Sequence, residues 1–247
     1  MALQSNHFYL ENVLEELDTP GEWYFSPKDS MLYFWPNSTA TAVPTSSASG
    51  ATAEELELEL GLELVAPLLD TLVSVKGAKD VSIEGIHFTE TRATYLEQYE
   101  VPSGGDWSIH RGAAVFIEDS SNITVVACTF NQTGGNALML SNDVTDSAIL
   151  ENEFVHTGDS AIATLGTSDR IFATAPTYPN RIMIRGNHIH EVGVFGKQTS
   201  CYFQALASNV SLIDNLCYNG PRAGLNYNVS SSAIDRQQPP VPGRPLA

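Results

Sequence analysis

A repeat of 24 residues is the feature of this sequence that most constrains its fold. Ala113, Ala137 and Ala161 are each 24 residues apart, and so are Phe130 and Phe154. Around these positions, short runs rich in Val, Ile and Phe alternate with Gly, Asn and Asp, which favour turns. A unit of this length with two or three short strands cannot bury its own apolar face, whereas stacked units bury it continuously. The repeat therefore predicts a solenoid.

Five stretches of the sequence fit one frame and define the coils of this solenoid. They are residues 81–88, 123–130, 147–154, 182–189 and 210–217. A leucine-rich repeat has a similar period, but its leucine and asparagine spacing is absent and no stretch is typical of one helix per repeat. The sequence therefore predicts an all-β protein with the architecture of a parallel β-helix.

One position of this frame is occupied by Cys128, Asn152, Asn187 and Asn215. Asparagines in equivalent turns can stack on one another and hydrogen-bond along the solenoid, coil after coil. We therefore predict a structural and not a catalytic role for this position.

Two coils are longer than the repeat, since the spacing from Asn152 to Asn187 is 35 residues and that from Asn187 to Asn215 is 28. The additional residues must leave the solenoid as loops, which we place within 166–180 and 197–202. Loops that project from a rigid scaffold are common places for function.

The rest of the chain predicts further segments. Residues 23–25 and 31–35 are aromatic, β-prone runs around a five-residue turn, which indicates a hairpin within an N-terminal segment 1–36. Residues 37–55, mostly Ser, Thr, Ala and Gly, predict a flexible loop. Alternating leucines at 56–64 predict a strand that opens the β-helix, assigned to 56–228, and the proline-rich residues 229–247 predict a disordered tail.

Composition restricts the class of ligand. The formal net charge is −17, from 29 acidic and 12 basic residues, and no basic cluster is present, which argues against nucleic acid as a partner. No apolar run is long enough for a membrane span, and the first residues lack the features of a signal peptide. The three cysteines cannot all pair and form no C-x-x-C motif, so we interpret at least two as small core residues. No metal or other cofactor is predicted.

A stripe of polar residues follows the strand that ends each repeat. Two residues after the last apolar residue of each coil stand Glu90, Gln132, His156, Glu191 and Asn219. Because adjacent coils are about 4.8 Å apart, these side chains form one patch along the solenoid. Asp159 lies three residues further along its own coil, so we expect it on the same side as Glu191.

Asp159 and Glu191 are the candidate catalytic residues. Two carboxyl groups across a groove are what glycoside hydrolysis needs, one as general acid and one as nucleophile or base. The alternative for Asp159 is a structural role, in which its carboxyl caps a turn by accepting hydrogen bonds from backbone amides.

Further candidates would bind a sugar around this pair. Trp107 offers a ring for stacking, and the polar candidates are His110, His156, His190, Lys197, Gln198 and Arg222. We interpret His188 and His190 as facing opposite sides of a strand end. A metal site formed by His156, His190 and Glu191 is an alternative that we do not adopt, because solvated or turn-bonded histidines are commoner.

Residues 11–24 and 32–36, followed by the coils, resemble the large right-handed β-helix proteins of the pectate-lyase-like superfamily, especially its β-helical glycoside hydrolases. The resemblance implies two acidic catalytic residues on the groove of the helix, which match Asp159 and Glu191, and an extracellular or secretory location. Polygalacturonase-type members have paired aspartates where this chain has Asp159 and Ser160, and the calcium-binding aspartates of pectate lyases are not apparent. Members are usually longer, so the chain is expected to be a fragment.

The sequence thus predicts a carbohydrate-active protein, a glycoside hydrolase that acts on an extracellular polysaccharide with two carboxyl groups. A non-catalytic module that binds polysaccharide or protein is the main alternative. A polysaccharide lyase or epimerase is the third reading, for which Lys197 and Arg222 would supply a base and a partner for a uronate carboxylate.

Overall fold

The computed structural model describes residues 10–35, 65–102, 107–167 and 177–228. The chain divides into two units, residues 1–65 and 66–247, which are described separately. The predicted loop at 37–55, the predicted strand at 56–64 and the predicted tail at 229–247 lie outside the described residues. Within the described residues, no helix is long and apolar enough to cross a membrane.

The described part of the first unit contains a 3₁₀ turn, η1 (Leu14–Glu16), and the predicted hairpin. Strands β1 (Trp23–Ser26) and β2 (Met31–Phe34) pair antiparallel, with Trp23 opposite Phe34. The rings of Tyr24 and Tyr33 lie 5.9 Å apart on this hairpin. Asn12 exchanges two side-chain hydrogen bonds with the backbone of Phe25, which fastens the preceding segment to β1. The hairpin prediction is confirmed.

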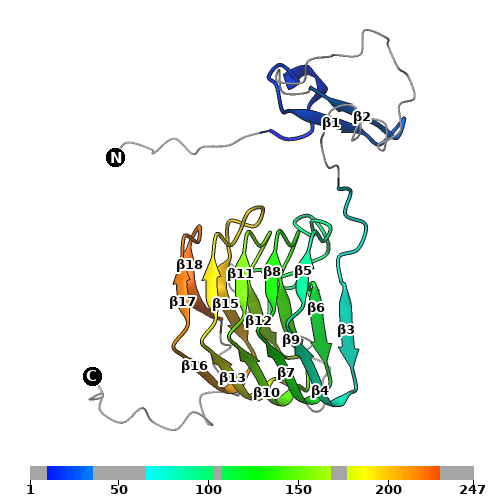
Figure 1. Cartoon of the computed structure of the whole chain (residues 1–247). Helices are drawn as coiled ribbons and strands as arrows, with labels where there is room; N and C mark the ends of the chain where they lie inside the picture. Colours follow the sequence, from blue (N-terminus) through cyan, green and yellow to red (C-terminus); the bar gives the residue numbers. More distant parts are fainter. Residues whose placement is uncertain (1–9, 36–64, 103–106, 168–176, 229–247) are drawn as a thin grey trace, which may run out of the picture. The chain divides into compact units, whose positions relative to one another are not determined.

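The second unit is built from three parallel sheets (Figure 1). The first sheet holds β3 (Val73–Lys76), β6 (Val115–Glu118), β9 (Leu138–Ser141), β12 (Ile162–Leu165), β15 (Ser200–Ala205) and β18 (Ala223–Tyr227). The second holds β4 (Lys79–Glu84), β7 (Ser121–Val126), β10 (Thr145–Leu150), β13 (Asn180–Arg185) and β16 (Ser208–Ile213). The third holds β5 (His87–Thr89), β8 (Thr129–Asn131), β11 (Glu153–Val155), β14 (His188–His190) and β17 (Leu216–Tyr218). Each complete coil gives one strand to each sheet in chain order, which confirms the predicted parallel β-helix.

The register between coils is the one that the repeat predicts. Phe130 pairs with Phe154, Phe154 with Ile189, and Ile189 with Cys217. The buried rings of Phe88, Phe130 and Phe154 stack inside the helix, with centroids 4.9 and 4.7 Å apart. Equivalent apolar side chains therefore pack directly on one another and form a continuous core.

The asparagine position forms the predicted ladder. The Asn152 Oδ1 atom accepts a hydrogen bond from the backbone N–H of Cys128 at 2.9 Å. Asn187 Oδ1 accepts both the backbone and the side-chain N–H of Asn152, each at 3.0 Å, and the side chain of Asn187 donates to Asn215 Oδ1 at 2.8 Å. Asn152 and Asn187 are buried. The structural role of this position is thus confirmed.

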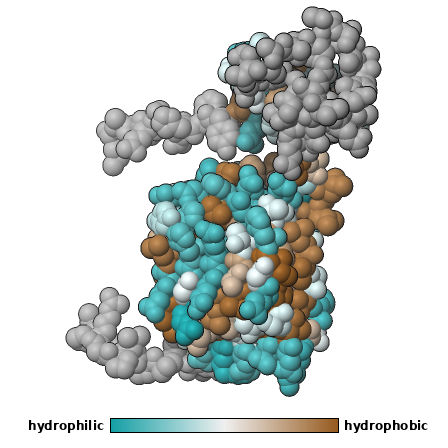
Figure 2. All heavy atoms as spheres, viewed as in Figure 1, coloured by the Kyte–Doolittle hydropathy of each residue, from teal (hydrophilic) through white to brown (hydrophobic). Residues whose placement is uncertain are grey.

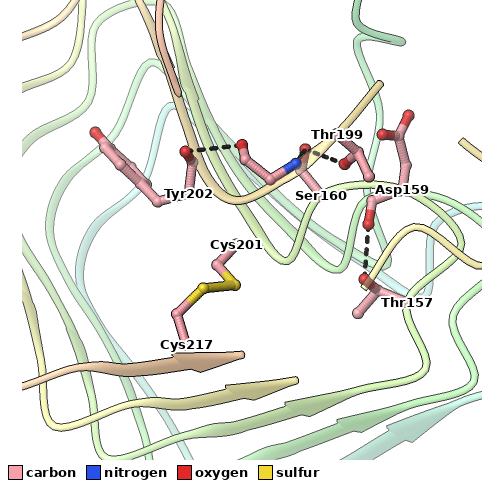
Figure 3. Close-up of a disulfide and its surroundings, with 8 residues drawn as sticks. Thr157, Asp159, Ser160, Thr199, Cys201, Tyr202 and Cys217 are labelled. Carbon is pink, nitrogen blue, oxygen red and sulfur yellow. Dashed lines mark hydrogen bonds between the residues drawn. A yellow bond between two sulfur atoms is a disulfide. The ribbon is translucent and has the colours of Figure 1, made fainter. Parts of the chain in front are cut away.

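The cysteines are partly as expected. Cys128 and Cys201 are buried, as predicted for core residues, but Cys201 also forms a disulfide with Cys217, which the sequence did not indicate. Figure 3 shows this bond together with Thr199, whose hydroxyl hydrogen-bonds Ser160 at 2.7 Å. The disulfide joins β15 to β17 and so closes the last complete coil across its interior.

The insertions leave the β-helix at its turns. The first predicted loop, 166–180, falls between β12, which ends at Leu165, and β13, although Asn180 already belongs to β13 and residues 168–176 lie outside the described residues. The second lies at 191–199, so the predicted range 197–202 is wrong at its end, where Ser200 already belongs to β15. A third and longer insertion, residues 90–114 between β5 and β6, was not predicted.

The surface of the β-helix unit is uneven. Figure 2 shows hydrophobic residues gathered on the side where Figure 1 places β3, and hydrophilic residues over much of the remaining visible face. Among the described residues, strand β3 pairs with β6 alone, so the apolar residues of the first coil have one neighbouring coil there. Val73, for example, is only partly buried there.

The ladder provides a test of the fold. Asn187→Ala is expected to lower the free energy of unfolding by about 3 kcal/mol, because buried amide and carbonyl groups of neighbouring coils lose their hydrogen-bond partners. Urea unfolding followed by circular dichroism measures this loss. Ser211→Ala, on the exposed side of β16, is the control and should change stability by less than about 0.5 kcal/mol. Equal losses in both variants would contradict the proposed role of the ladder.

Candidate functional site

A pocket of about 350 Å³ opens between insertion 90–114 and the turns that follow β11 and β14. Its size lies within the range of about 300–1,000 Å³ that is usual for small-molecule sites. It is lined by Thr94, Tyr95, Glu97, Tyr99, Ser108, Ile109, His110, Asp159, Gly196, Lys197 and Gln198. Four of the nine predicted site residues, His110, Asp159, Lys197 and Gln198, therefore meet in one pocket.

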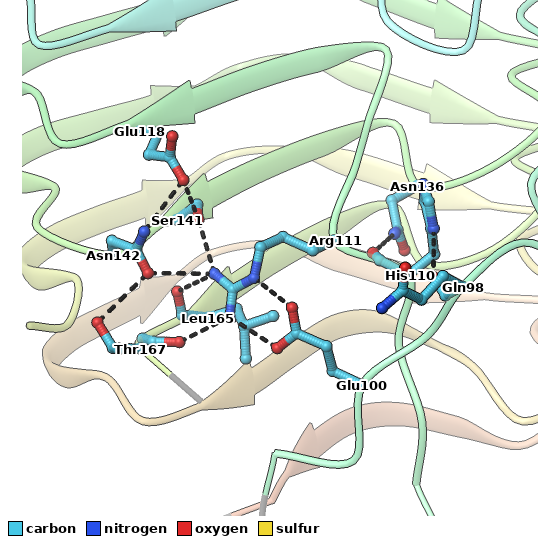
Figure 4. A network of polar contacts seen from close by, with 11 residues as sticks. Gln98, Glu100, His110, Arg111, Glu118, Asn136, Ser141, Asn142, Leu165 and Thr167 are labelled. Atoms are coloured by element: carbon cyan, nitrogen blue, oxygen red, sulfur yellow. Dashed lines mark hydrogen bonds and ion pairs between the residues drawn. The ribbon is translucent and has the colours of Figure 1, made fainter. Parts of the chain in front are cut away.

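Insertion 90–114 is held against the β-helix by Arg111. The Arg111 guanidinium binds both carboxylate oxygens of Glu100, at 2.6 and 2.9 Å, within the same insertion. It also donates to the Ser141 hydroxyl at 2.7 Å and to the Gly166 carbonyl at 2.9 Å, which belong to other coils (Figure 4). A planar guanidinium with five N–H groups suits such a junction. The outer wall of the pocket is thus fixed by a cation that reaches across three coils.

A second contact holds the end of the insertion next to the pocket. The side-chain amide of Asn136 donates to the backbone carbonyls of His110 and Gly112, both at 3.0 Å. His110 Nδ1 in turn lies 2.8 Å from the carbonyl oxygen of Gln98. The imidazole of His110 is therefore positioned at the pocket wall by its own insertion.

Asp159 forms part of the inner wall of the pocket. Burial raises the pKa of its carboxyl above the usual range for aspartate, although hydrogen bonds from Thr199 and Ser160 and the nearby His110 act in the opposite direction. Gly196 makes room for this group, because a Cβ atom at that position would lie 3.1 Å from Asp159 Oδ1. The pocket therefore contains a carboxyl group that holds its proton more tightly than a solvated aspartate does.

The other pocket residues differ in their contacts within the protein and in their exposure. The Lys197 ammonium donates to the carbonyls of Gly193 and Val194, at 2.9 and 2.8 Å, and so serves its own turn. Tyr95 and Tyr99 are 61% and 63% exposed, which leaves most of each side chain accessible to a ligand. Glu97 forms an ion pair with Arg92 at 2.5 Å and is the second carboxylate of the pocket.

Glu191 is not among the residues that line this pocket. Its carboxylate accepts a hydrogen bond from Asn219 at 2.7 Å and another from His190 Nδ1, and these contacts lower the pKa of Glu191. His156, which is exposed, acts on the pKa of Glu191 in the same direction. Asp159 and Glu191 thus belong to two different polar clusters, and their role as a catalytic pair stays a prediction.

His188 and His190 do not face opposite sides, and that interpretation was wrong. Their rings lie 4.6 Å apart on the same outer face of β14, because residues two apart in a strand point to the same side. Both rings also contact Tyr218 of β17, at 5.6 and 5.1 Å between centroids. His190 therefore belongs to the cluster of Glu191 and not to the pocket.

Trp107 and Arg222 form a third arrangement. The guanidinium carbon of Arg222 lies 4.6 Å from the centroid of the Trp107 ring, and this ring also packs against the buried Phe203 at 6.4 Å. The indole of Trp107 thus makes a cation–π contact with Arg222 and also packs against the core. The predicted role of Trp107 in stacking on a sugar stays a prediction.

The polar stripe is a repeated backbone position. Its five residues all have left-handed backbone angles, with φ between 50° and 58°, just after the strands of the third sheet; they are Glu90, Gln132, His156, Glu191 and Asn219. Most residues adopt this conformation at a cost, which Asn bears better than others. The stripe therefore has a conformational role in turning each coil.

Sequence reasoning missed the outer wall of the pocket, the six residues Thr94, Tyr95, Glu97, Tyr99, Ser108 and Ile109. A signal was present, because Phe88 and Phe130 occupy equivalent positions yet are 42 residues apart instead of 24. The excess length indicates an insertion, but the repeat contains no information about the turns over which it folds.

Comparison with known proteins identifies one family. The model of the right handed beta helix region matches residues 113–236, which covers the coils from β6 onward. No curated protein and no solved structure matches the chain.

The raised pKa of Asp159 predicts a pH-dependent effect of Asp159→Asn on stability. A carboxyl whose pKa is higher in the folded state destabilises that state as pH rises from the ordinary aspartate value, about 3.9, through the folded pKa. The variant should therefore match the wild type at low pH and become the more stable of the two as pH rises toward neutrality. Thermal unfolding between pH 3 and pH 8 measures this difference.

Asp214→Asn is the matched control for this measurement, since Asp214 is exposed. Its effect should not follow the same pH profile. If Asp159→Asn becomes less stable than the wild type as pH rises, the Asp159 carboxylate is stabilised in the fold and the account of its burial is wrong.

Proposed function

This chain belongs to the right-handed β-helix family, and from that premise we propose that it is a carbohydrate-active β-helix whose pocket around Asp159 binds part of an extracellular polysaccharide. A solenoid of this kind supports many functions, so the proposal rests on the pocket and not on the fold. The observation that carries it is a carboxyl group with a raised pKa in a pocket that is also lined by two accessible tyrosines.

The composition of the pocket suits a sugar. Tyr95 and Tyr99 offer aromatic faces against which the C–H groups of a sugar ring can pack, with a hydroxyl at the far end of each. Ser108, His110 and Gln198 add groups that can donate to or accept from sugar hydroxyls. A binding site with an apolar face and a few directed polar groups has the usual anatomy of a small-molecule site.

For hydrolysis, we assign the role of general acid to Asp159. Its raised pKa keeps a proton available for transfer to the oxygen of the glycosidic bond as that bond breaks. Glu97 is the second carboxylate of the pocket, and we assign to it the attack on the anomeric carbon or the activation of water. Glu191 lies outside the pocket lining and takes no part in this scheme.

A non-catalytic binding module is the second candidate. It is favoured by the contacts of the two carboxyl groups, since Asp159 is hydrogen-bonded by Thr199 and Ser160 and Glu97 is paired with Arg92. Both groups would then position hydroxyls of a bound sugar without proton transfer. A lyase is less well supported, because the Lys197 ammonium is already bound to two carbonyls.

The disulfide supports the extracellular part of the proposal. Bonds such as Cys201–Cys217 form and persist mainly in oxidising compartments. The net charge of −17 is also compatible with a neutral polysaccharide and unfavourable for a strongly anionic one.

The proposal is tested with a panel of neutral and uronate-containing oligosaccharides, by calorimetry for binding and by chromatography for released products. Tyr95→Ala and Tyr99→Ala should weaken binding by tenfold or more, whereas Tyr33→Ala, on the hairpin of the other unit, should not. For an oligosaccharide that is hydrolysed, Asp159→Asn and Glu97→Gln should each lower kcat by about 10²–10⁴-fold. Glu191→Gln should leave the rate unchanged.

The outcomes separate the two candidates. Binding that depends on Tyr95 and Tyr99 without any hydrolysis supports the non-catalytic module. A rate that falls with Glu191→Gln and not with Glu97→Gln would instead restore the pair of Asp159 and Glu191. Absence of binding across the panel would overturn the carbohydrate proposal.

A further inference from the structure

The outer face of the third sheet carries a second group of functional side chains. Glu153 on β11 and His188 on β14 are directly paired, and His190 lies two residues further along β14 on the same face. Each offers one ligand atom, and these three atoms all lie within 4.8 Å of one another. None of the three residues lines the pocket around Asp159.

The distances within this group fit a shared ion better than direct pairing. Oε1 of Glu153 lies 3.8 Å from His188 Nδ1 and 3.9 Å from His190 Nε2, both too long for hydrogen bonds. Zinc binds nitrogen and oxygen at about 2.0–2.2 Å, which places two ligand atoms of a tetrahedral site roughly 3.4 Å apart. Both Glu153 distances exceed this value by only about half an ångström, so small side-chain movements would bring the carboxylate oxygen to one ion with either imidazole nitrogen.

The far side of each imidazole is already occupied, as in established metal sites. The Tyr218 hydroxyl lies 3.0 Å from His188 Nε2, and the Glu191 carboxylate is hydrogen-bonded to His190 Nδ1. Because an ionised carboxylate can only accept, Nδ1 of His190 carries a proton, and in the neutral imidazole Nε2, 3.9 Å from Glu153 Oε1, then holds the lone pair that a metal ion needs. Histidine ligands are commonly fixed in tautomer and orientation by such outer partners.

We propose that Glu153, His188 and His190 form a binding site for a divalent transition-metal ion such as Zn²⁺, with Glu191 as a positioning residue that acts through His190. Two imidazoles and one carboxylate suit Zn²⁺ and its neighbours, whereas Ca²⁺ and Mg²⁺ prefer oxygen ligands throughout. Three protein ligands on an accessible sheet face leave the remaining coordination positions to water or to a ligand. Asn219, which donates to Glu191 at 2.7 Å, holds the positioning carboxylate in place.

The site is tested by titrating the full, untagged chain with Zn²⁺ in calorimetry and in competition with a chromogenic chelator. We expect one ion per chain with a Kd in the micromolar range or below. His188→Ala, His190→Ala and Glu153→Gln should each weaken binding by at least tenfold. Glu191→Gln, which removes an outer partner and no ligand, should weaken it by about 10–100-fold.

Two readouts distinguish a built site from surface binding. His87→Ala, which removes an exposed histidine of β5 on the same sheet, is the matched control and should leave the affinity unchanged. Nitrogen-15 spectra of the imidazoles should show coordination through Nδ1 of His188 and Nε2 of His190 when Zn²⁺ is added. A Kd above about 1 mM, or an affinity that is the same in the double variant His188→Ala/His190→Ala, would overturn the proposal.

Discussion

The register between stacked coils is the constraint on which the rest of this structure depends. Equivalent residues lie about 4.8 Å apart in neighbouring coils. Each side chain must therefore pack against, or hydrogen-bond with, the equivalent side chain of the next coil. The stacked rings of Phe88, Phe130 and Phe154 meet this condition in the core, and the hydrogen-bonded Asn152 and Asn187 meet it at a turn. Each inner coil is bonded on both sides, so additional residues can leave only at the turns.

The candidate sites follow from where these additional residues leave. Insertions 90–114 and 191–199 both connect a strand of the third sheet to the first-sheet strand of the next coil, and so does the short turn that carries Asp159. Residues of insertion 90–114 line one pocket with Asp159, and burial raises the pKa of the Asp159 carboxyl. Glu191 in the next coil is half-exposed, and its hydrogen bonds lower its pKa. The surroundings of these two carboxyl groups on neighbouring coils thus shift their pKa values in opposite directions.

The repeated part of the molecule was predictable from the sequence because its contacts obey a period. The pairing of Phe130 with Phe154, the ladder of Asn152 and Asn187 and the aromatic hairpin were all predicted and are confirmed. The outer wall of the pocket was not, because insertion 90–114 has no repeat and its position depends on the contacts of Arg111 with distant coils.

Other differences have equally local causes. The disulfide of Cys201 and Cys217 joins two sheets within one coil. The repeat relates equivalent positions of neighbouring coils, so it gives no information about contacts between two positions of the same coil. The prediction for His188 and His190 was wrong because it did not apply the strand alternation, which places residues two apart on the same face. That shared face is the basis of the proposed metal site.

The most direct test of this account is a carbon-13 NMR titration of the Asp159 side-chain carboxyl in the full chain, assigned with the Asp159→Asn variant. A pocket formed by insertion 90–114 predicts that this carboxyl titrates above the ordinary aspartate value of about 3.9. It also predicts a return toward that value when Arg111→Ala releases the insertion. A carboxyl that titrates at or below 3.9 in the wild type would contradict the burial of Asp159, and with it the general acid on which the proposed chemistry depends.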